Sequence, residues 1–506
     1  MKPTIMKFGG TSVEGATAFK NVAGIVFDRR SLHPVVVVSA MAGFTDALIL
    51  SVQQALAVRP TAGVDSLGKH FDRHLRVVEA LLRSEAPRMR QLIEQSAKEI
   101  QELLNATAAE VSVAGVIESR KRRKFFEDAV VSYGERLSAA LLAAVLIENQ
   151  VGCTDVDARR CIITDDEHGC AAPLMTETAC STRAQLEPLI ASGRTPVLGG
   201  FIGATVDGVT TTLGRGGSDY TAALVGAALE AKEIQIWTDV PGVLTADPRL
   251  VANARTVPHL SFEEAAELAY FGAKVLHPKT LHPAIERDIP VRICNSRAQE
   301  GGSTLVVGES KKSSETVKAI AHKTGVTTIQ VTSTRMLGAY GFLRALFGVF
   351  AEHKTAVDVV TTSEVSVSLS LDDTTSLGEI VAELEKLGTV SVEGKRAIIC
   401  VVGEGLRTTP GIAARIFSTI SDINVSLISQ GASRINVTFA VEEEHVRETV
   451  ARLHKEFFEG AESEDALREL NDLSAVNAID QQANAEPRAV ASGCSTMRRA
   501  ARRIRD

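Results

Sequence analysis

The chain has 506 residues, of which 45% are hydrophobic and 23% are charged, and these proportions exclude a wholly disordered or fibrous protein. A formal net charge of −7 argues against wholesale nucleic-acid binding, which favours strongly basic faces. The length suggests about three domains.

Neither a membrane span nor a targeting segment is expected. The longest apolar stretch, Ala139–Ile147, has nine residues, whereas a bilayer span needs about 20. Gly9 and Gly10 come too early to leave room for the apolar region of a signal peptide. The seven cysteines form no Cys-x-x-Cys pair, a distribution typical of reduced thiols. We therefore expect a cytoplasmic protein with no membrane and no nucleic-acid partner.

The first 300 residues alternate short aliphatic runs with helical patterns. Ile5–Phe8 and Val35–Val38 are apolar runs typical of strands buried on both faces. Between them, Ala16–Arg29 places its apolar residues at helical spacing. Strand, helix and strand in this order form a βαβ unit. We therefore predict an α/β domain with a mainly parallel sheet sandwiched by helices.

Further elements follow along the chain. Asp65–Leu104, with one Pro, and Phe126–Glu148 are predicted to be helical. Residues 199–217 hold seven glycines in 19 positions, where average usage gives one or two. The helix after them is expected to begin at Ser218-Asp219 and to run through Ala231. Strands are predicted again at Ile234–Thr238 and Val291–Cys294.

The last third of the chain contains an internal repeat. Shifting Ile329–Leu371 by 70 positions lays it on Ile399–Val441 without a gap. Each copy predicts a strand, a glycine turn, a helix and two more strands. Two copies are too few for a solenoid, so we predict two small α+β modules. The predicted division is a domain at 1–307, a linker at 308–318, modules at 319–390 and 396–460, and a partly disordered tail at 461–506.

The segment Lys7–Ser12 has the composition of a phosphate-binding loop. A buried strand ends in Lys7 and runs into Gly9 and Gly10, whose backbone N–H groups can approach an anion closely. Loops at the carboxyl ends of parallel strands are where open α/β sheets bind ligands. An ordinary strand–helix turn, capped by Thr11 or Ser12, remains the alternative.

Other segments also suggest ligand contacts. In the run TTTLGRGGSDY, Arg215 can grip a carboxylate with two parallel hydrogen bonds, while Asp219 also suits a helix start. Thr238–Gly242, leading to Asp247-Pro248-Arg249, suits a nucleotide or is a plain β-turn. Lys274 follows a helix rich in Glu, and alone it would be read as a surface lysine. The loop Ser39–Asp46 and the helix residue Glu135 are two further candidates for ligand contacts.

Together these motifs resemble the motif series of aspartate kinases. KFGGTSV at 7–13, SAMAGFTD at 39–46, YGERLSA at 133–139, TLGRGGSDYTAA at 212–223, WTDVPGV at 237–243 and FGAKVLHP at 271–278 occur in the order and spacing of that family. The resemblance covers about residues 1–455. The repeat resembles the paired ACT (ferredoxin-like) regulatory modules of the same enzymes, and MLGAYGFL at 336–343 is especially similar to the lysine-sensitive type.

The resemblance implies transfer of the ATP γ-phosphoryl group to the β-carboxylate of L-aspartate, giving 4-phospho-L-aspartate. This is the first step towards lysine, threonine and methionine. Mg-ATP is the implied nucleotide, and no protein ligand for a metal is predicted. The implied catalytic residues are Lys7, Asp219 and Lys274, the aspartate-binding residues are Ser39, Thr45, Glu135, Arg215 and Ser218, and the ATP-binding residues are Lys7, Gly9, Gly10, Thr238, Asp239, Leu244, Arg249 and Lys274.

The resemblance also implies feedback inhibition by an end-product amino acid, with lysine first and threonine as runner-up. The implied effector residues are Met336, Gly341, Phe342, Leu343, Val357 and Asp358. A homodimer or homotetramer formed through the ACT modules is expected.

Three positions depart from the family pattern. Leu244 stands where many relatives have Tyr, while Ala339 and Ala356 stand where the lysine-sensitive pattern has Ser. Each replacement removes a polar group that could contact the nucleotide or the effector.

Two other functions fit parts of the sequence. Another amino-acid kinase or a carbamate kinase relative would share the Lys–Gly-Gly and glycine-rich loops. It would not be expected to combine Arg215, Glu135 and the repeat. A non-catalytic amino-acid sensor would keep the repeat but should lose Lys7, Asp219 or Lys274, all of which are present. A fusion to homoserine dehydrogenase is not expected, because of the length and the missing dinucleotide fingerprint.

Overall fold

The computed structural model describes residues 2–114, 120–272, 278–298, 301–308 and 316–459. Lys274, most of the predicted linker and the predicted tail lie outside these described residues.

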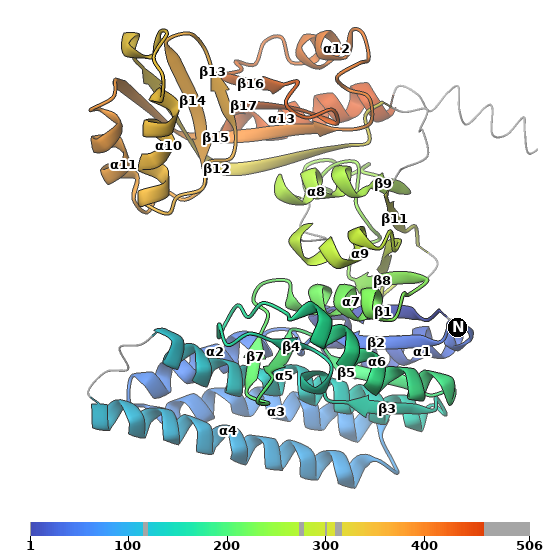
Figure 1. The fold of residues 1–506 in the computed structure, drawn as a ribbon. Helices are drawn as coiled ribbons and strands as arrows, with labels where there is room; N and C mark the ends of the chain where they lie inside the picture. The colour runs from blue at the N-terminus through green and yellow to red at the C-terminus, as the bar shows by residue number, and fades with distance from the viewer. Residues whose placement is uncertain (1, 115–119, 273–277, 299–300, 309–315, 460–506) are drawn as a thin grey trace, which may run out of the picture. The chain divides into compact units, whose positions relative to one another are not determined.

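An eight-stranded sheet forms the centre of the N-terminal part (Figure 1). Its strand order is β3-β5-β2-β1-β8-β10-β11-β9. All of its neighbouring strands are parallel except β10 and β11. This arrangement confirms the predicted mainly parallel sheet. The strands are β1 (Thr4–Phe8), β2 (Pro34–Val38), β3 (Cys153–Val156), β5 (Thr195–Gly199), β8 (Glu233–Thr238), β9 (His259–Ser261), β10 (Val291–Asn295) and β11 (Thr304–Val307).

Helices cover both faces of this sheet, and successive residues of one strand face opposite layers. Met6 and Phe8 of β1 pack with the layer of α1 to α5. Ile5 packs with the layer that contains α6 and α7. The helices are α1 (Ala16–Asp28), α2 (Phe44–Leu56), α3 (Pro60–Leu81), α4 (Ala86–Ala114), α5 (Arg120–Glu148), α6 (Met175–Ala191), α7 (Gly217–Ala228), α8 (Phe262–Tyr270) and α9 (His282–Glu286).

Helix α5 begins six residues before the predicted start at Phe126. Among the described helices, the segment Lys121–Glu148 is the single one long and apolar enough to cross a membrane by length and composition. However, 89% of its apolar window is buried inside the protein. It is therefore packed as a core helix of the domain.

Helix α7 ends at Ala228, so the prediction that it runs through Ala231 is wrong. Glu230 has a left-handed φ of 48°, and the N–H of Ala231 closes the helix end by donating to the carbonyl of Gly226. A local backbone reversal of this kind leaves no mark in the hydrophobic pattern. A small sheet lies beside the helix start, in the order β4 (Ile163–Thr164), β6 (Ile202–Thr205) and β7 (Thr210–Thr212).

The repeat folds as predicted, with a strand, a glycine turn, a helix and two strands in each copy. Its six strands form one antiparallel sheet in the order β13-β14-β12-β15-β17-β16. The elements are β12 (Ala319–Thr332), α10 (Phe342–Glu352), β13 (Val360–Thr362), β14 (Ser366–Leu371), α11 (Leu377–Leu384), β15 (Thr389–Val402), α12 (Ile412–Thr419), β16 (Leu427–Gln430), β17 (Asn436–Glu442) and α13 (Val446–His454).

The two modules share strands β12 and β15. Val331 near the end of β12 pairs with Val390 at the start of β15, and Ile320 at the start of β12 pairs with Val401. Each module therefore completes its sheet with half of a strand from the other copy. Strand β15 runs through the interval that was predicted to separate the modules at 390 and 396.

Short 3-10 turns connect several elements: η1 (Gly10–Val13), η2 (Arg30–Leu32), η3 (Ala158–Arg160), η4 (Pro278–Leu281), η5 (Thr334–Met336) and η6 (Glu443–His445). A π-helical turn, η7 (Lys455–Glu459), is the described part of a second unit that begins at Lys455.

Candidate active site

A cavity of about 560 Å³ opens beside the carboxyl ends of β1, β2 and β5. Residues of α5 and of the start of α7 contribute to its walls. The cavity brings together eight of the predicted site residues, namely Lys7, Gly10, Ser39, Thr45, Glu135, Arg215, Ser218 and Asp219.

Lys7 and Asp219 form an ion pair in this cavity. The ammonium of Lys7, at the end of β1, lies 2.6 Å from Oδ1 of Asp219 in the first turn of α7. The two side chains are only 11% and 15% exposed, so water screens the pair weakly. Asp219 thus holds the positively charged ammonium of Lys7 in place at the carboxyl edge of the sheet.

The loops after β1 and β2 approach each other very closely. A Cβ at Gly10 would lie 2.9 Å from the carbonyl oxygen of Ala40, so only glycine fits there without a shift. The N–H of Ala42 donates to the carbonyl of Gly10, and the N–H of Ser39 donates to the carbonyl of Phe8. This contact fixes the backbone around Lys7 relative to Ser39.

Glu135, on α5, supplies a buried carboxyl group to the lining of the cavity. The N–H of Ala40 donates to its Oε1 over 3.3 Å. Its Oε2 is buried and has no hydrogen-bond partner among the described residues. Burial raises the pKa of Glu135 to about 8, although the hydrogen bond from Ala40 opposes that rise. An incoming ammonium group would satisfy Oε2 and favour the ionised form.

Arg215 lies in the turn that leads into α7. Gly216, which follows it, has a φ of 73° and caps the helix start, a conformation that favours glycine. Arg215 is exposed yet lines the cavity that Glu135 also lines. The cavity therefore offers a guanidinium for a carboxylate and a buried carboxyl group for an ammonium, the pair needed to bind an α-amino acid.

Two of the predicted nucleotide residues, Lys7 and Gly10, line this cavity, whereas Gly9, Thr238, Asp239, Leu244 and Arg249 lie outside its lining. The N–H of Gly9 donates to the carbonyl of Trp237, so Gly9 lies beside the strand end that carries Thr238. The hydroxyl of Thr238 donates to Asp239. Leu244 forms an isolated bridge with Thr256. Arg249 is 85% exposed and binds both carboxylate oxygens of Asp247.

The predicted effector residues cluster around the first module. Met336, Phe342 and Val357 pack against one hydrophobic core, which includes Leu346 and Phe350. Gly341 caps α10, and Leu343 follows in its first turn.

Asp358 lies just before β13 and is paired with a lysine of β12. The ammonium of Lys323 lies 3.3 Å from its Oδ2 and also contacts Asp372. Burial and the neighbouring carboxyl of Asp372 raise the pKa of Asp358 to about 7. An effector ammonium would have to compete with Lys323 for this carboxyl group.

Several cavity residues were not predicted from the sequence. Asp128, Gly169, Phe201 and Thr212 all line the cavity. Asp128 could have been found from its position seven residues before Glu135, because seven residues are close to two helical turns. The other three lie on segments whose approach to the cavity is set by tertiary packing.

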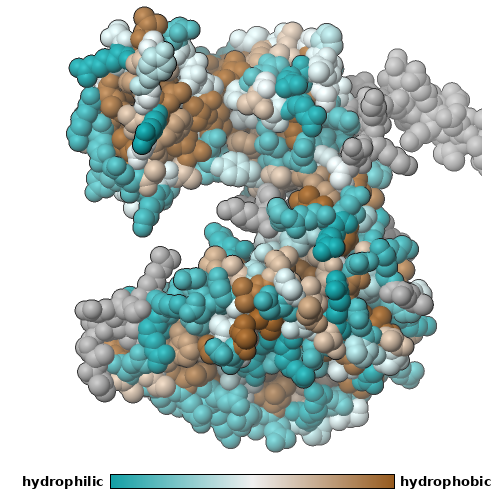
Figure 2. All heavy atoms as spheres, in the orientation of Figure 1, coloured by the Kyte–Doolittle hydropathy of each residue, from teal (hydrophilic) through white to brown (hydrophobic). Residues whose placement is uncertain are grey.

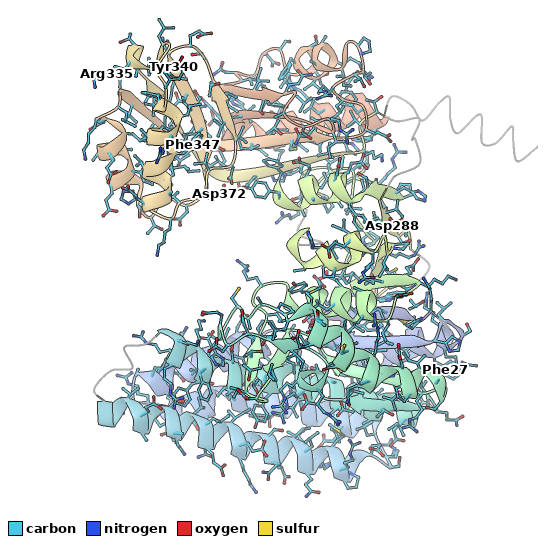
Figure 3. The ribbon with its side chains drawn as sticks, viewed as in Figure 1. Phe27, Asp288, Arg335, Tyr340, Phe347 and Asp372 are labelled. Carbon is cyan, nitrogen blue, oxygen red and sulfur yellow. The ribbon has the colours of Figure 1, made fainter. Side chains whose placement is uncertain are left out.

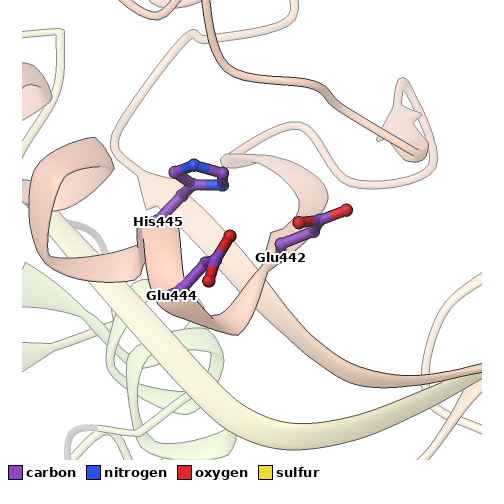
Figure 4. Close-up of side chains that lie close together, drawn as sticks. All are labelled: Glu442, Glu444 and His445. Carbon is purple, nitrogen blue, oxygen red and sulfur yellow. The ribbon is translucent and has the colours of Figure 1, made fainter.

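Three potential metal ligands lie close together at the end of β17. Ligand atoms of Glu442, Glu444 and His445 lie within 4.8 Å of one another (Figure 4). Glu442 already binds Arg396, and none of the three is fully buried. We therefore assign no metal to this cluster.

Comparison with known proteins gives matches over both parts of the chain. Residues 2–295 match the amino acid kinase family, and residues 399–457 match an ACT domain family. Lysine-sensitive aspartokinase 3 of Escherichia coli K12 is 37% identical, and the match covers 90% of this chain and 99% of that protein. The chloroplastic aspartokinase 1 of Arabidopsis thaliana is 36% identical, covering 92% and 81%.

Comparison with solved structures also finds aspartokinases. The chain is similar to E. coli aspartokinase III in complex with aspartate and ADP, with a TM-score of 0.76 and 36% identity. It is also similar to that protein in complex with lysine and aspartate, with a TM-score of 0.74. Each match covers 90% of this chain and 100% of the other. The predicted combination of an amino-acid-kinase fold with ACT modules is thereby confirmed.

Proposed function

This chain belongs to the aspartokinase family, and from that premise we propose that it transfers the γ-phosphoryl group of ATP to the β-carboxylate of L-aspartate. The product is 4-phospho-L-aspartate, the first intermediate towards lysine, threonine and methionine. The observation that carries the proposal is one cavity that combines the Lys7–Asp219 pair with Glu135 and Arg215.

The reaction needs positioning and charge stabilisation rather than a general base. The nucleophile is a carboxylate with an unperturbed pKa of about 3.9, so it is already ionised at neutral pH. Phosphoryl transfer then depends on orienting the two substrates in line and on neutralising charge around the moving group. Lys7, held by Asp219, supplies positive charge at the glycine loop of Gly9 and Gly10. We assign the same role to Lys274, which lies outside the described residues.

We assign aspartate binding to the two charged walls of the cavity. Arg215 binds the α-carboxylate and Glu135 binds the α-ammonium, while Ser39, Thr45 and Ser218 complete the pocket. ATP lies towards Gly9 and Thr238, with Asp239, Leu244 and Arg249 on the nucleotide side.

Mg²⁺ is proposed to enter bound to the nucleotide. Mg²⁺ is commonly held by substrate phosphates together with one or two carboxylates. Asp219, a carboxylate that lines the cavity, is already paired with Lys7. This donor set fits an ion held mainly by phosphate oxygens.

We propose lysine as the feedback inhibitor, with threonine as runner-up. One relative is named for its lysine sensitivity, and its solved structures include one with lysine. Met336, Phe342 and Val357 are gathered on one core, beside which Gly341 and Leu343 begin α10. In this chain Ala339 and Ala356 replace the expected Ser residues, so two hydroxyl groups that could contact the effector are missing.

An exposed apolar surface supports a homodimer or homotetramer formed through the modules. Leu337 and Tyr340 precede α10 and are 65% and 104% exposed, and Leu343 and Phe347 lie on that helix with exposures of 40% and 36%. Tyr340 and Phe347 are labelled on the first module in Figure 3, and Figure 2 shows hydrophobic residues gathered over the same module.

We also propose that the enzyme is cytoplasmic.

A coupled ADP-release assay tests this function. ADP release should require L-aspartate, and lysine should inhibit it more strongly than threonine or methionine. Asp358→Ala should reduce the sensitivity to lysine, while Asp373→Ala, a change at an exposed neighbouring carboxylate, should leave it intact. Equal lysine sensitivity in wild type and Asp358→Ala would place the effector elsewhere. A wild type that does not respond to lysine would remove the lysine assignment.

A further inference from the structure

A buried carboxylate that phosphoryl transfer does not use lies in the wall of the active-site cavity. Asp128 is on α5, and its side chain is 1% exposed. It stands seven residues before Glu135, so the two side chains lie on nearly the same face of the helix. Both residues line the cavity.

Three hydrogen-bond donors from two other segments converge on Asp128. Nδ1 of His168 and the backbone N–H of Gly169 donate to Oδ2 over 2.8 and 3.0 Å. The hydroxyl of Thr212 donates to Oδ1 over 2.5 Å. Burial raises the pKa of Asp128, and these hydrogen bonds oppose that rise. The carboxylate therefore joins α5 to the loop around residue 168 and to the end of β7.

One of these segments carries the turn that contains Arg215, and the other packs against that turn. Thr212 is the last residue of β7, three positions before Arg215. The N–H of Ala171 donates to the carbonyl of Thr212 over 2.9 Å. Gly214 packs so closely on the same loop that a Cβ there would lie 3.3 Å from Sγ of Cys170. Asp128 thus contacts both the strand that carries the arginine turn and the loop that supports it.

We propose that Asp128 is a positioning residue that sets the distance between Arg215 and Glu135. Because Asp128 and Glu135 share one helix, tying the Arg215 turn to Asp128 also ties it to Glu135. The groups assigned to the α-carboxylate and to the α-ammonium of one substrate are then held at a fixed spacing. This inference rests on the proposed function, which gives Arg215 and Glu135 those roles.

Steady-state kinetics of three variants test the positioning role. Asp128→Asn keeps the size of the side chain but directs an amide N–H₂ at groups that also donate. Thr212→Val removes one hydroxyl with little change of shape, and Thr212→Ser retains it. We expect the KM for aspartate to rise about tenfold in Asp128→Asn and several-fold in Thr212→Val. In both of these variants the kcat and the KM for ATP should stay close to wild type, because the lost interaction serves the ground and transition states of aspartate equally. All constants of Thr212→Ser should stay close to wild type, because it keeps the hydroxyl.

Asp157→Asn is the matched control. Asp157 is a partly buried carboxylate of the same domain that accepts hydrogen bonds from Arg159, and it does not line this cavity. This variant should lower the melting temperature without raising the KM for aspartate.

The outcomes separate this inference from the proposed function. A wild type without aspartate-dependent activity overturns the proposed function. An active wild type with an unchanged aspartate KM in folded Asp128→Asn and Thr212→Val overturns the positioning role alone. Equal losses in Thr212→Ser and Thr212→Val, or a parallel rise in the ATP KM, also overturn it. The two Thr212 variants decide the matter if Asp128→Asn does not fold.

Discussion

Arg215 reaches the cavity from a glycine-rich turn, and its planar guanidinium is proposed to bind the α-carboxylate of aspartate with two parallel hydrogen bonds. Lysine has the same charge but cannot reproduce this geometry. Arg215→Lys should therefore raise the KM for aspartate at least about tenfold and leave the KM for ATP nearly unchanged. Initial rates measured against each substrate in turn provide the comparison. Equal weakening of ATP binding would assign Arg215 to the phosphates instead.

The raised pKa of Glu135 predicts that aspartate binding is accompanied by proton release. Burial raises its pKa to about 8, so the free enzyme carries this group mostly protonated at pH 7. The aspartate ammonium favours the carboxylate and lowers that pKa, so binding should release up to about one proton per site. The release should fade as the pH rises above 8, where the free group is already ionised.

Calorimetric titration of aspartate in buffers of different ionisation enthalpy measures this proton. Glu135→Gln is the control, since its amide does not titrate. A proton release that persists in Glu135→Gln would show that another group titrates.

At the scale of single elements, the packing of α2 against α3 places a histidine away from water. His74 is fully buried, its ring lies tilted against that of Phe44, and its Nδ1–H donates to the carbonyl of His70 over 2.7 Å. Burial lowers the pKa of His74 to about 4, which outweighs the effect of that hydrogen bond. The unfolded chain, with an ordinary pKa of about 6.5, therefore binds a proton that the folded chain excludes.

This difference predicts a loss of stability in acid. Well above pH 6.5 both states are neutral and His74 has no effect on the pH dependence. As the pH falls from 6.5 to 5, His74 alone should cost the folded state about 2 kcal/mol. The fall in melting temperature between pH 7 and pH 5 should be smaller in His74→Gln. An unchanged fall would mean that His74 is not a source of the acid sensitivity.

Elements whose partners are close in sequence were predictable. The βαβ unit of β1, α1 and β2 follows from apolar spacing within 35 residues. The repeat revealed both modules because the same pattern occurs twice. The shared strands β12 and β15 were not predictable, because strand pairing over about 70 residues depends on the whole sheet. The spacing of Asp128 from Glu135 places it on the cavity face of α5, but its hydrogen-bond partners lie 40 to 84 residues away and were not predictable.

At the scale of the whole molecule, the exposed apolar residues of the first module predict self-association. The wild type should sediment at twice or four times the mass of one chain. Tyr340→Asp, which places a charge on the proposed interface, should shift it towards a single chain. Val206→Asp is the control, because Val206 is 73% exposed on the turn between β6 and β7. A wild type that sediments as one chain at micromolar concentration would contradict the proposed interface.

Lys7 provides the most direct measurement of the proposed reaction. The acyl phosphate product can be trapped with hydroxylamine as an aspartate hydroxamate while ADP is measured in the same sample. The wild type should form hydroxamate and ADP in equal amounts, and only when L-aspartate is present. Folded Lys7→Ala should lose about two to three orders of magnitude in both rates, because the positive charge at the glycine loop is gone. ADP release without hydroxamate, or a folded Lys7→Ala with near-normal rates, would contradict aspartate phosphorylation at this site.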